Sequence, residues 1–315
     1  MNTSICPICN HTISHFSLNA RDIIFGTEVN YEYLSCRGCE HLWLHPKFNL
    51  DLVGFNEPNQ DFILGVMNHP FVNKMLYLPR IRWLANRISL DKSKEALDIG
   101  CGTGTFIRLL RQMYGCKCDG IDSDSIFTQY QTDPDINVQI TSFEELKTEK
   151  LYDLITMFHL IEHLTEPRSA IQKAIDMLKP GGYLCLETPA SDSIAFRIFK
   201  NNWFPLLPPY HRHIFSRKSL NLLIGELSSA QIVEFENVYI SGEFLVSASL
   251  PLVRYAPHPF QKRHLNWLQK ISSSFGIFSL FFITLPAEIF IAGTLRLMDV
   301  ASHQRILIHK RASSP

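Results

Sequence analysis

The stretch EALDIGCGTGT, residues 95–105, places three glycines at alternate positions between an apolar run and a helix-like segment. The run ALDI, residues 96–99, has the composition of a buried parallel strand. The following letters TFIRLLRQM carry apolar residues at helical spacing. Gly100, Gly102 and Gly104 leave out side chains, so a ligand can approach the backbone between strand and helix. Strand, glycine loop and helix together predict a nucleotide-binding turn.

An acid follows at the place where a nucleoside would need one. The next strand-like segment, CKCDGID, ends at Asp122, 22 residues after Gly100. A carboxylate at the tip of the second strand can accept hydrogen bonds from both hydroxyls of a ribose. The alternative is an ordinary solvated acid in a loop.

Strand-like and helical segments alternate along the rest of the chain. VQIT, YDLITMF and GYLCLET follow, then AQIVEFENVYI at 230–240, and QRILIHK at 304–310 closes the series. The helical segment EPRSAIQKAIDMLKPGG ends in Lys-Pro-Gly-Gly, a strong stop signal. This alternation predicts an α/β fold with a doubly wound, mostly parallel sheet.

Two C-x-x-C pairs stand near the N-terminus and predict a zinc ribbon. Twenty-six residues rich in strand formers separate CPIC from CRGC, which is consistent with a hairpin between two knuckles. Four thiolates in two knuckles can close a tetrahedron around zinc and leave no open position for chemistry, so the expected role is structural. The predicted ligands are Cys6, Cys9, Cys36 and Cys39.

The balance of charge argues against a large nucleic-acid footprint. Lys+Arg and Asp+Glu number 30 each, whereas nucleic-acid-binding domains are usually basic. The N-terminus shows no basic segment followed by an apolar core, and the cysteine usage fits a reducing compartment. We therefore expect a cytoplasmic protein, with the inner face of the membrane as its alternative location.

The motifs LDIGCGTG, GIDSD, YDLITMFHLIEHLTEP and LKPGGYLCLETP together resemble those of class I S-adenosylmethionine-dependent methyltransferases, over about residues 95 to 241. The N-terminal pairs, with HLWLHP, look like the zinc-ribbon head of some bacterial members, which often occur in surface-polysaccharide or small-metabolite pathways. The resemblance implies a seven-stranded, Rossmann-like sheet whose last strand is antiparallel. It also implies that S-adenosylmethionine is the cofactor. The residues expected to line it are Asp98, Gly100, Cys101, Gly102, Gly104, Asp122, Ser123, Ser142, Phe143 and Phe158.

The spacing of the glycines separates this reading from a dinucleotide site. Dinucleotide-binding loops usually read G-x-G-x-x-G, whereas this loop reads G-x-G-x-G. The adenine contact stays open at this point. Ser142 occupies the usual place of an acid in the family, Phe143 could cover the ring, and Glu144 follows.

Two histidines are candidates for the chemistry of methyl transfer. His159 follows the fourth strand, beside the expected methyl group, and His213 lies in the segment HIFS after the fifth strand. Either could act as a general base or as a substrate contact near neutral pH. The alternative for each is a structural histidine, in the wall of the site or at the entry of a helix.

The domain boundaries follow from these motifs. We expect a zinc ribbon at 1–45, a helical linker or cap at 46–94, the methyltransferase domain at 95–241 and 303–315, and an apolar helical insertion at 242–302. The insertion contains ISSSFGIFSLFFITLPA, with no charged residue. It is expected either to pack internally or in a dimer, or to touch a membrane surface or lipid-linked substrate through 271–292.

The function predicted from the sequence is methyl transfer to an oxygen or carbon nucleophile of a small-molecule acceptor, either sugar-containing or lipid-linked. Two alternatives remain open. One is an RNA methyltransferase with a zinc module, and the other is a catalytically silent binding protein that keeps the fold.

Overall fold

The computed structural model describes most of the chain outside the late apolar segment. The insertion expected at 242–302, including the candidate membrane contact at 271–292, lies almost entirely outside the described residues. No helix in the described part has the length and apolar character needed to cross a membrane. The described residues are 5–11, 17–22, 29–48, 70–124, 136–240, 247–248 and 301–312.

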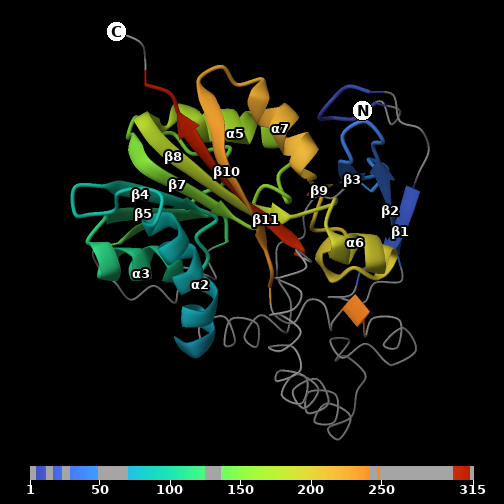
Figure 1. Ribbon diagram of the computed structural model, residues 1–315, viewed down its shortest axis with the longest axis horizontal. Coiled ribbons are helices and arrows are strands. Elements are labelled where there is room, and N and C mark those ends of the chain that lie inside the picture. Colours follow the sequence, from blue (N-terminus) through green and yellow to red (C-terminus); the bar gives the residue numbers. More distant parts are fainter. Residues whose placement is uncertain are drawn as a thin grey trace, which may run out of the picture.

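A seven-stranded sheet forms the centre of the molecule, in the order β10-β11-β8-β7-β4-β5-β6 (Figure 1). Neighbours from β8 to β6 run parallel, whereas β11 is antiparallel to both β8 and β10. The predicted doubly wound sheet with an antiparallel last strand is thus confirmed. The strands are β4 (Glu95–Ile99), β5 (Lys117–Asp122), β6 (Asn137–Ile140), β7 (Tyr152–Phe158), β8 (Leu178–Pro189), β10 (Ala230–Val238) and β11 (His303–Lys310).

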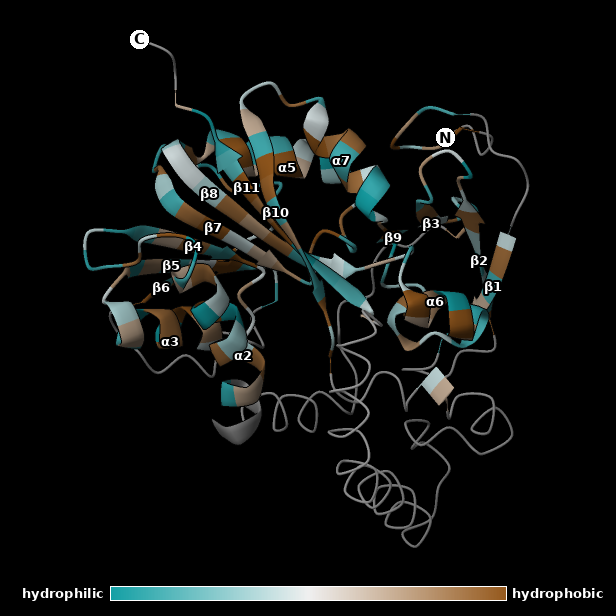
Figure 2. Ribbon diagram, viewed as in Figure 1, coloured by the Kyte–Doolittle hydropathy of each residue, from teal (hydrophilic) through white to brown (hydrophobic). Residues whose placement is uncertain are grey.

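Helices cover both faces of this sheet. On one face α2 (Pro70–Ala85) packs beside α3 (Thr105–Tyr114), and on the other lie α5 (Pro167–Asp176) and α7 (Arg217–Gly225) (Figure 1). Most of β7 and the middle of β8 are apolar, as Figure 2 shows, because both faces of the sheet are covered there.

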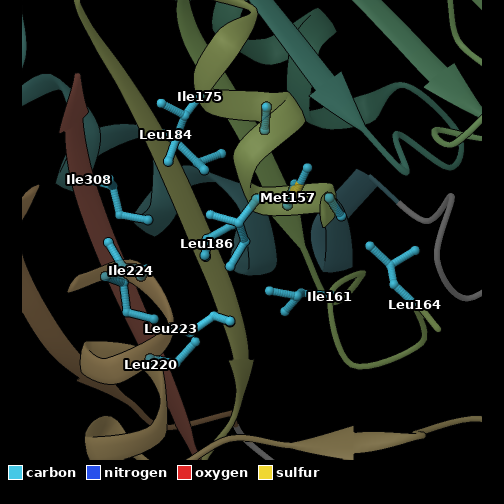
Figure 3. Packing of buried hydrophobic residues seen from close by; sticks show 14 of the residues in the cluster. Met157, Ile161, Leu164, Ile175, Leu184, Leu186, Leu220, Leu223, Ile224 and Ile308 are labelled. Carbon is cyan, nitrogen blue, oxygen red and sulfur yellow. The ribbon is translucent and has the colours of Figure 1, made fainter. Parts of the chain in front are cut away.

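Each face has its own apolar core. Under α5 and α7 the core joins residues of β7, β8 and β11, among them Met157, Leu186 and Ile308 (Figure 3). Under α2 and α3 it includes Phe106 and Leu110, which lie four residues apart on one side of α3. Burial of these faces fixes the parallel register that brings the carboxyl ends of β4, β5, β7 and β8 to one rim.

A second, four-stranded sheet contains the N-terminal strands. Its order is β1 (Ser17–Arg21), β2 (Asn30–Ser35), β3 (Leu42–Leu44) and β9 (His213–Ile214), all antiparallel. The fourth strand comes from the second half of the chain. The N-terminal segment expected at 1–45 therefore shares its sheet with the segment that follows β8.

Hydrogen bonds between side chains and backbone strengthen this junction. Ser216 Oγ donates to the carbonyl oxygen of Cys39 at 2.5 Å, and Ser191 Oγ donates to that of Glu40 at 2.6 Å. The hydroxyl of Tyr33, which is fully buried, lies 2.7 Å from the carbonyl oxygen of His211. The short elements α6 (Ile194–Phe199), η1 (Lys200–Asn202) and η2 (Phe204–Leu206) pack beside this sheet.

Candidate active site

The glycine loop follows β4 in a conformation that side chains disfavour. Gly100, Gly102 and Gly104 have φ values of 74°, 51° and 69°, in the left-handed region. A Cβ atom added to Gly102 would meet nothing within 4 Å, so the space beside this backbone is open. A Cβ on Gly100 would lie 3.2 Å from Leu160, so here the neighbouring loop packs against the backbone.

The acid predicted to hold a ribose lies directly against this loop. Asp122 Oδ2 accepts a hydrogen bond from the N–H of Gly102 at 2.8 Å, and Oδ1 accepts one from the N–H of Asp124 at 2.9 Å. Burial raises the pKa of Asp122, while these N–H donors act in the opposite direction. The structure thus brings the glycine loop and the second-strand acid to one place on the rim.

A second acid, Asp98, lies within β4 at the start of the loop. It is 4% exposed, and Thr156 Oγ1 on β7 donates a hydrogen bond to its Oδ1 at 2.5 Å. Burial raises the pKa of Asp98 to about 7, with a further contribution from the charge of Asp122, although the Thr156 hydroxyl opposes the shift. Asp98 is therefore held in place at the start of the glycine loop, and it is protonated at a higher pH than an ordinary aspartate.

Two other residues expected to line the cofactor, Ser142 and Phe143, make contacts outside the glycine loop. Phe143 is 5% exposed and belongs to the core beside α5, where Lys173 Nζ lies 5.0 Å from its ring centroid. This placement does not support the expectation that Phe143 covers an adenine ring. The Oγ of Ser142 accepts a hydrogen bond from the N–H of Glu145 at 3.2 Å, which is a local turn contact.

Three further predicted residues surround the loop. Cys101 is 5% exposed and packs against Gly120, so burial raises the pKa of its thiol and leaves it inert. Ser123 is exposed beside Asp122. Phe158 is half-buried and packs edge-on against Phe106, with ring centroids 4.9 Å apart.

His159 follows β7 and lies between two buried carboxylates. Its Nδ1 is 3.4 Å from Glu162 Oε1, and its Nε2 is 3.2 Å from Glu187 Oε1. Burial alone would lower the pKa of His159, but the two carboxylates outweigh it and raise the pKa to about 9. Because both ring nitrogens face carboxylates, this geometry favours a contact role over proton removal.

The centre of this charged cluster is Glu187, near the end of β8. Arg305 on β11 donates from Nε to Glu187 Oε2 at 2.8 Å, and Arg80 on α2 donates from Nε to Oε1 at 3.1 Å. Burial would raise the pKa of Glu187, but the two guanidinium groups hold it well below its usual range. None of these three residues was expected at the site. The available signal was a charged residue inside each of three apolar segments, LCLETP, YLPRIRW and QRILI.

The ring of the second predicted catalytic histidine contacts His41 and not His159, although its backbone N–H donates to the carbonyl oxygen of Glu162 at 3.0 Å. His213 is on β9, 8% exposed, and its Nδ1 is 3.1 Å from Nε2 of His41 on the N-terminal side of the junction. Burial lowers the pKa of His213 to about 4, so the ring is neutral. No contact joins the rings of His213 and His159 in the described residues, and the surroundings of His213 are those of a structural histidine within the four-stranded sheet, beside His41 and Phe215.

The four N-terminal cysteines come together as predicted. The Sγ atoms of Cys6 and Cys39 are 3.6 Å apart, and those of Cys9 and Cys36 are 3.5 Å apart. All four sulfurs lie within 4.8 Å of one another. A tetrahedron of thiolates about 2.3 Å from zinc has edges of about 3.8 Å, and the two shorter sulfur–sulfur distances are near this value.

The two cysteine knuckles have the same backbone pattern. Cys6 and Cys36 each donate an N–H to the carbonyl oxygen of a histidine five residues later, and each accepts one from the residue four positions on. The accepting turns end at Asn10 and Glu40, which have φ values of 58° and 60°. This repeated geometry brings the two pairs of sulfurs face to face.

Comparison with known proteins identifies a domain in just under half of the chain. The model of a methyltransferase domain family matches residues 77–227, which include the glycine loop, Asp122 and the His159 cluster as far as β8. Residues 77–227 are a methyltransferase domain. Its fold is also seen in a solved structure from Galdieria sulphuraria, described as a candidate sarcosine dimethylglycine methyltransferase. The TM-score is 0.50 at 15% identity, with 74% of this chain and 86% of the other covered.

Curated relatives match this methyltransferase domain in part. Two ubiquinone biosynthesis O-methyltransferases of Pseudomonas fluorescens are 32% identical over 118 residues and 30% identical over 149 residues. These matches take in 35% and 44% of this chain, and 50% and 63% of the relatives. The chain thus spans about half of the first relative and somewhat more of the second.

The raised pKa of Asp98 predicts a pH-dependent stability of the methyltransferase domain. An aspartate in the unfolded chain has a pKa of about 3.9. Between about pH 4 and pH 7 the folded chain therefore keeps a proton that the unfolded chain has lost, and the free energy of unfolding falls as the pH rises. Asp98→Asn is expected to flatten this fall by about 1.4 kcal/mol for each unit of pKa difference it removes.

Urea unfolding at pH 5 and pH 8 checks this expectation, with Asp176→Asn as a control on the exposed end of α5. Equal pH dependence in wild type and Asp98→Asn would contradict the assignment.

Proposed function

We propose that the chain transfers a methyl group from S-adenosylmethionine to a hydroxyl oxygen of a small-molecule acceptor. The observation that carries this proposal is the convergence of the Gly102 backbone and the Asp122 carboxylate at the rim of a methyltransferase domain. The names of the two Pseudomonas relatives favour oxygen over carbon as the methylated atom.

The residues at the rim fit the cofactor. Each carboxylate oxygen of Asp122 accepts one backbone N–H and keeps a further lone pair, so the pair can accept the two ribose hydroxyls. The open space beside Gly102 admits a ligand against the backbone. When bound, the cofactor supplies a methyl group activated by its sulfonium. The residues of the chain must align the acceptor with that group and exclude water, which contributes up to about 7–11 kcal/mol.

His159 is the residue proposed to contact the acceptor. It is the accessible member of its cluster, with 31% of its side chain exposed against 0% for Glu162 and 1% for Glu187. The two carboxylates hold both ring nitrogens, so the imidazole is fixed in orientation at the end of β7. A ring fixed in this way can position an acceptor beside the methyl group.

The acceptor class is proposed to be sugar-containing or lipid-linked. Support comes from the motif resemblance to bacterial polysaccharide-pathway and metabolite enzymes, and from the uncharged run at 271–287. The cysteine cluster is proposed to hold a structural zinc ion, because its sulfur spacing fits one. Such an ion would fix Cys39 and Glu40, whose carbonyl oxygens anchor the segment after β8.

Gly102→Asp tests the cofactor assignment. The substitution places a carboxylate beside Asp122 at a backbone φ of 51°, so repulsion and strain both oppose ligand binding. Calorimetry with S-adenosylhomocysteine should show at least a tenfold loss of affinity. Gly225→Asp, at the open end of α7, is the control and should bind as the wild type does. Full affinity in a folded Gly102→Asp protein would refute the cofactor site.

His159→Gln tests the acceptor contact. The chain is incubated with cell extract and a radiolabelled methyl donor, and label is counted in lipid, saccharide and RNA fractions. Label is expected in the lipid or saccharide fraction, and the variant should lower it more than tenfold while cofactor affinity stays within about twofold of the wild type. Unchanged turnover in the His159→Gln variant would show that His159 does not contact the acceptor. Labelled RNA, or no label anywhere, would support the alternative functions instead.

Cys36→Ser tests the zinc proposal. Cobalt bound to four thiolates gives a sulfur-to-metal charge-transfer absorption in the near ultraviolet, and loss of one thiolate should weaken that band and lower metal affinity. Cys116→Ala, a buried cysteine outside the cluster, is the control. Identical spectra and metal affinity in wild type and Cys36→Ser would rule out the ribbon as a metal site.

A further inference from the structure

A second group of metal-ligating side chains lies at the other end of the His159 cluster. Glu162 and His163 belong to the turn after β7, and His211 belongs to the loop that leads into β9. One carboxylate oxygen and one ring nitrogen of each histidine all lie within 4.8 Å of one another. The two imidazole rings are edge-on, with centroids 4.7 Å apart. This group contains no sulfur and shares no residue with the cysteine cluster.

The hydrogen bonds of the two histidines leave the same nitrogen available on each. His163 Nδ1 lies 3.0 Å from the carbonyl oxygen of Tyr210, and His211 Nδ1 lies 2.6 Å from that of Pro205. A carbonyl oxygen can only accept, so both Nδ1 atoms carry a hydrogen, and in the neutral form of each ring the lone pair is on Nε2. Metal-binding histidines are typically oriented by such a bond from the other ring nitrogen to a backbone carbonyl.

One carboxylate oxygen of Glu162 faces His159 but makes no well-formed hydrogen bond. The residue is 0% exposed, and Thr188 Oγ1 donates to its Oε2 at 3.0 Å. Oε1 has no hydrogen-bond partner among the described residues, although His159 Nδ1 lies 3.4 Å away. A buried carboxylate oxygen without a hydrogen bond is costly, and a cation at this position would satisfy it.

The backbone already holds the two ligand-bearing segments together. The carbonyl oxygen of Glu162 accepts the N–H groups of Arg212 and His213 at 2.8 Å and 3.0 Å. The turn after β7 and the loop before β9 are therefore fixed against each other without a metal. The three donor atoms, which lie within 4.8 Å of one another, are thus carried by segments already held in place.

We propose that Glu162, His163 and His211 bind one divalent transition-metal ion. Imidazole and carboxylate donors suit ions such as zinc, iron, nickel or cobalt, and three protein ligands leave a position open for water or another ligand. The ion links the turn that carries His159 to the loop that joins the N-terminal sheet. The inference does not depend on methyl transfer, because it concerns metal binding alone.

Cobalt titration of the full chain, purified with its native metal content, tests this site. With the cysteine cluster first filled with zinc, the wild type should bind one further cobalt ion per chain, with visible d–d bands and no sulfur-to-metal charge transfer, since no cysteine takes part at this second site. Glu162→Gln and His211→Gln keep the side-chain volume and should each weaken cobalt affinity at least tenfold. His309→Gln, on β11 beside Tyr183, is the matched control and should bind as the wild type does.

Two results would overturn the proposal. One is a wild-type chain that binds cobalt only with the charge-transfer band of the cysteine cluster, and this outcome needs no variant. The other is unchanged affinity in folded Glu162→Gln and His211→Gln proteins. Absence of methyl transfer together with intact cobalt binding would contradict the proposed function but not this metal site, so the two proposals are tested separately.

Discussion

One hydrogen bond, from the N–H of Gly102 to the carboxylate of Asp122, joins the two features on which the candidate active site depends. It requires β4 and β5 to end at the same rim, which parallel pairing ensures. It also requires a backbone without a side chain at Gly102, whose φ of 51° lies in the region that glycine tolerates best. Sheet register and loop conformation thus determine together where a nucleoside could bind.

The rest of the rim is organised by charge rather than by apolar packing. Glu187 is buried in β8 and is held by guanidinium groups from α2 and β11, elements that lie far from it in the sequence. A buried carboxylate without such partners would cost several kcal/mol, and removing one partner leaves the other charge uncompensated. This cluster therefore ties α2 and the last strand to the end of β8, and it holds His159 in place from one side.

Local patterns in the sequence were enough to predict the strands and a mostly parallel sheet, because apolar runs and glycine stops repeat at α/β spacing. The antiparallel last strand was expected only from the resemblance to a methyltransferase family. Asp122 and the four cysteines could also be placed, since short-range spacing brings them together. The pairing of β9 with β3, the interior position of His213 and the burial of Phe143 were not predictable in this way. Those outcomes depend on contacts between segments more than a hundred residues apart, or on which side of a turn faces the core.

The central claim is that Asp122 accepts hydrogen bonds from the ribose hydroxyls of a nucleoside bound against the Gly102 backbone. Calorimetry of S-adenosylhomocysteine and its 2′-deoxy analogue, with wild type and Asp122→Ala, tests it most directly. The wild type should prefer the natural ligand at least tenfold, and Asp122→Ala should lose most of that preference along with affinity. An unaltered preference in the variant, or no binding of either ligand by the wild type, would contradict the account.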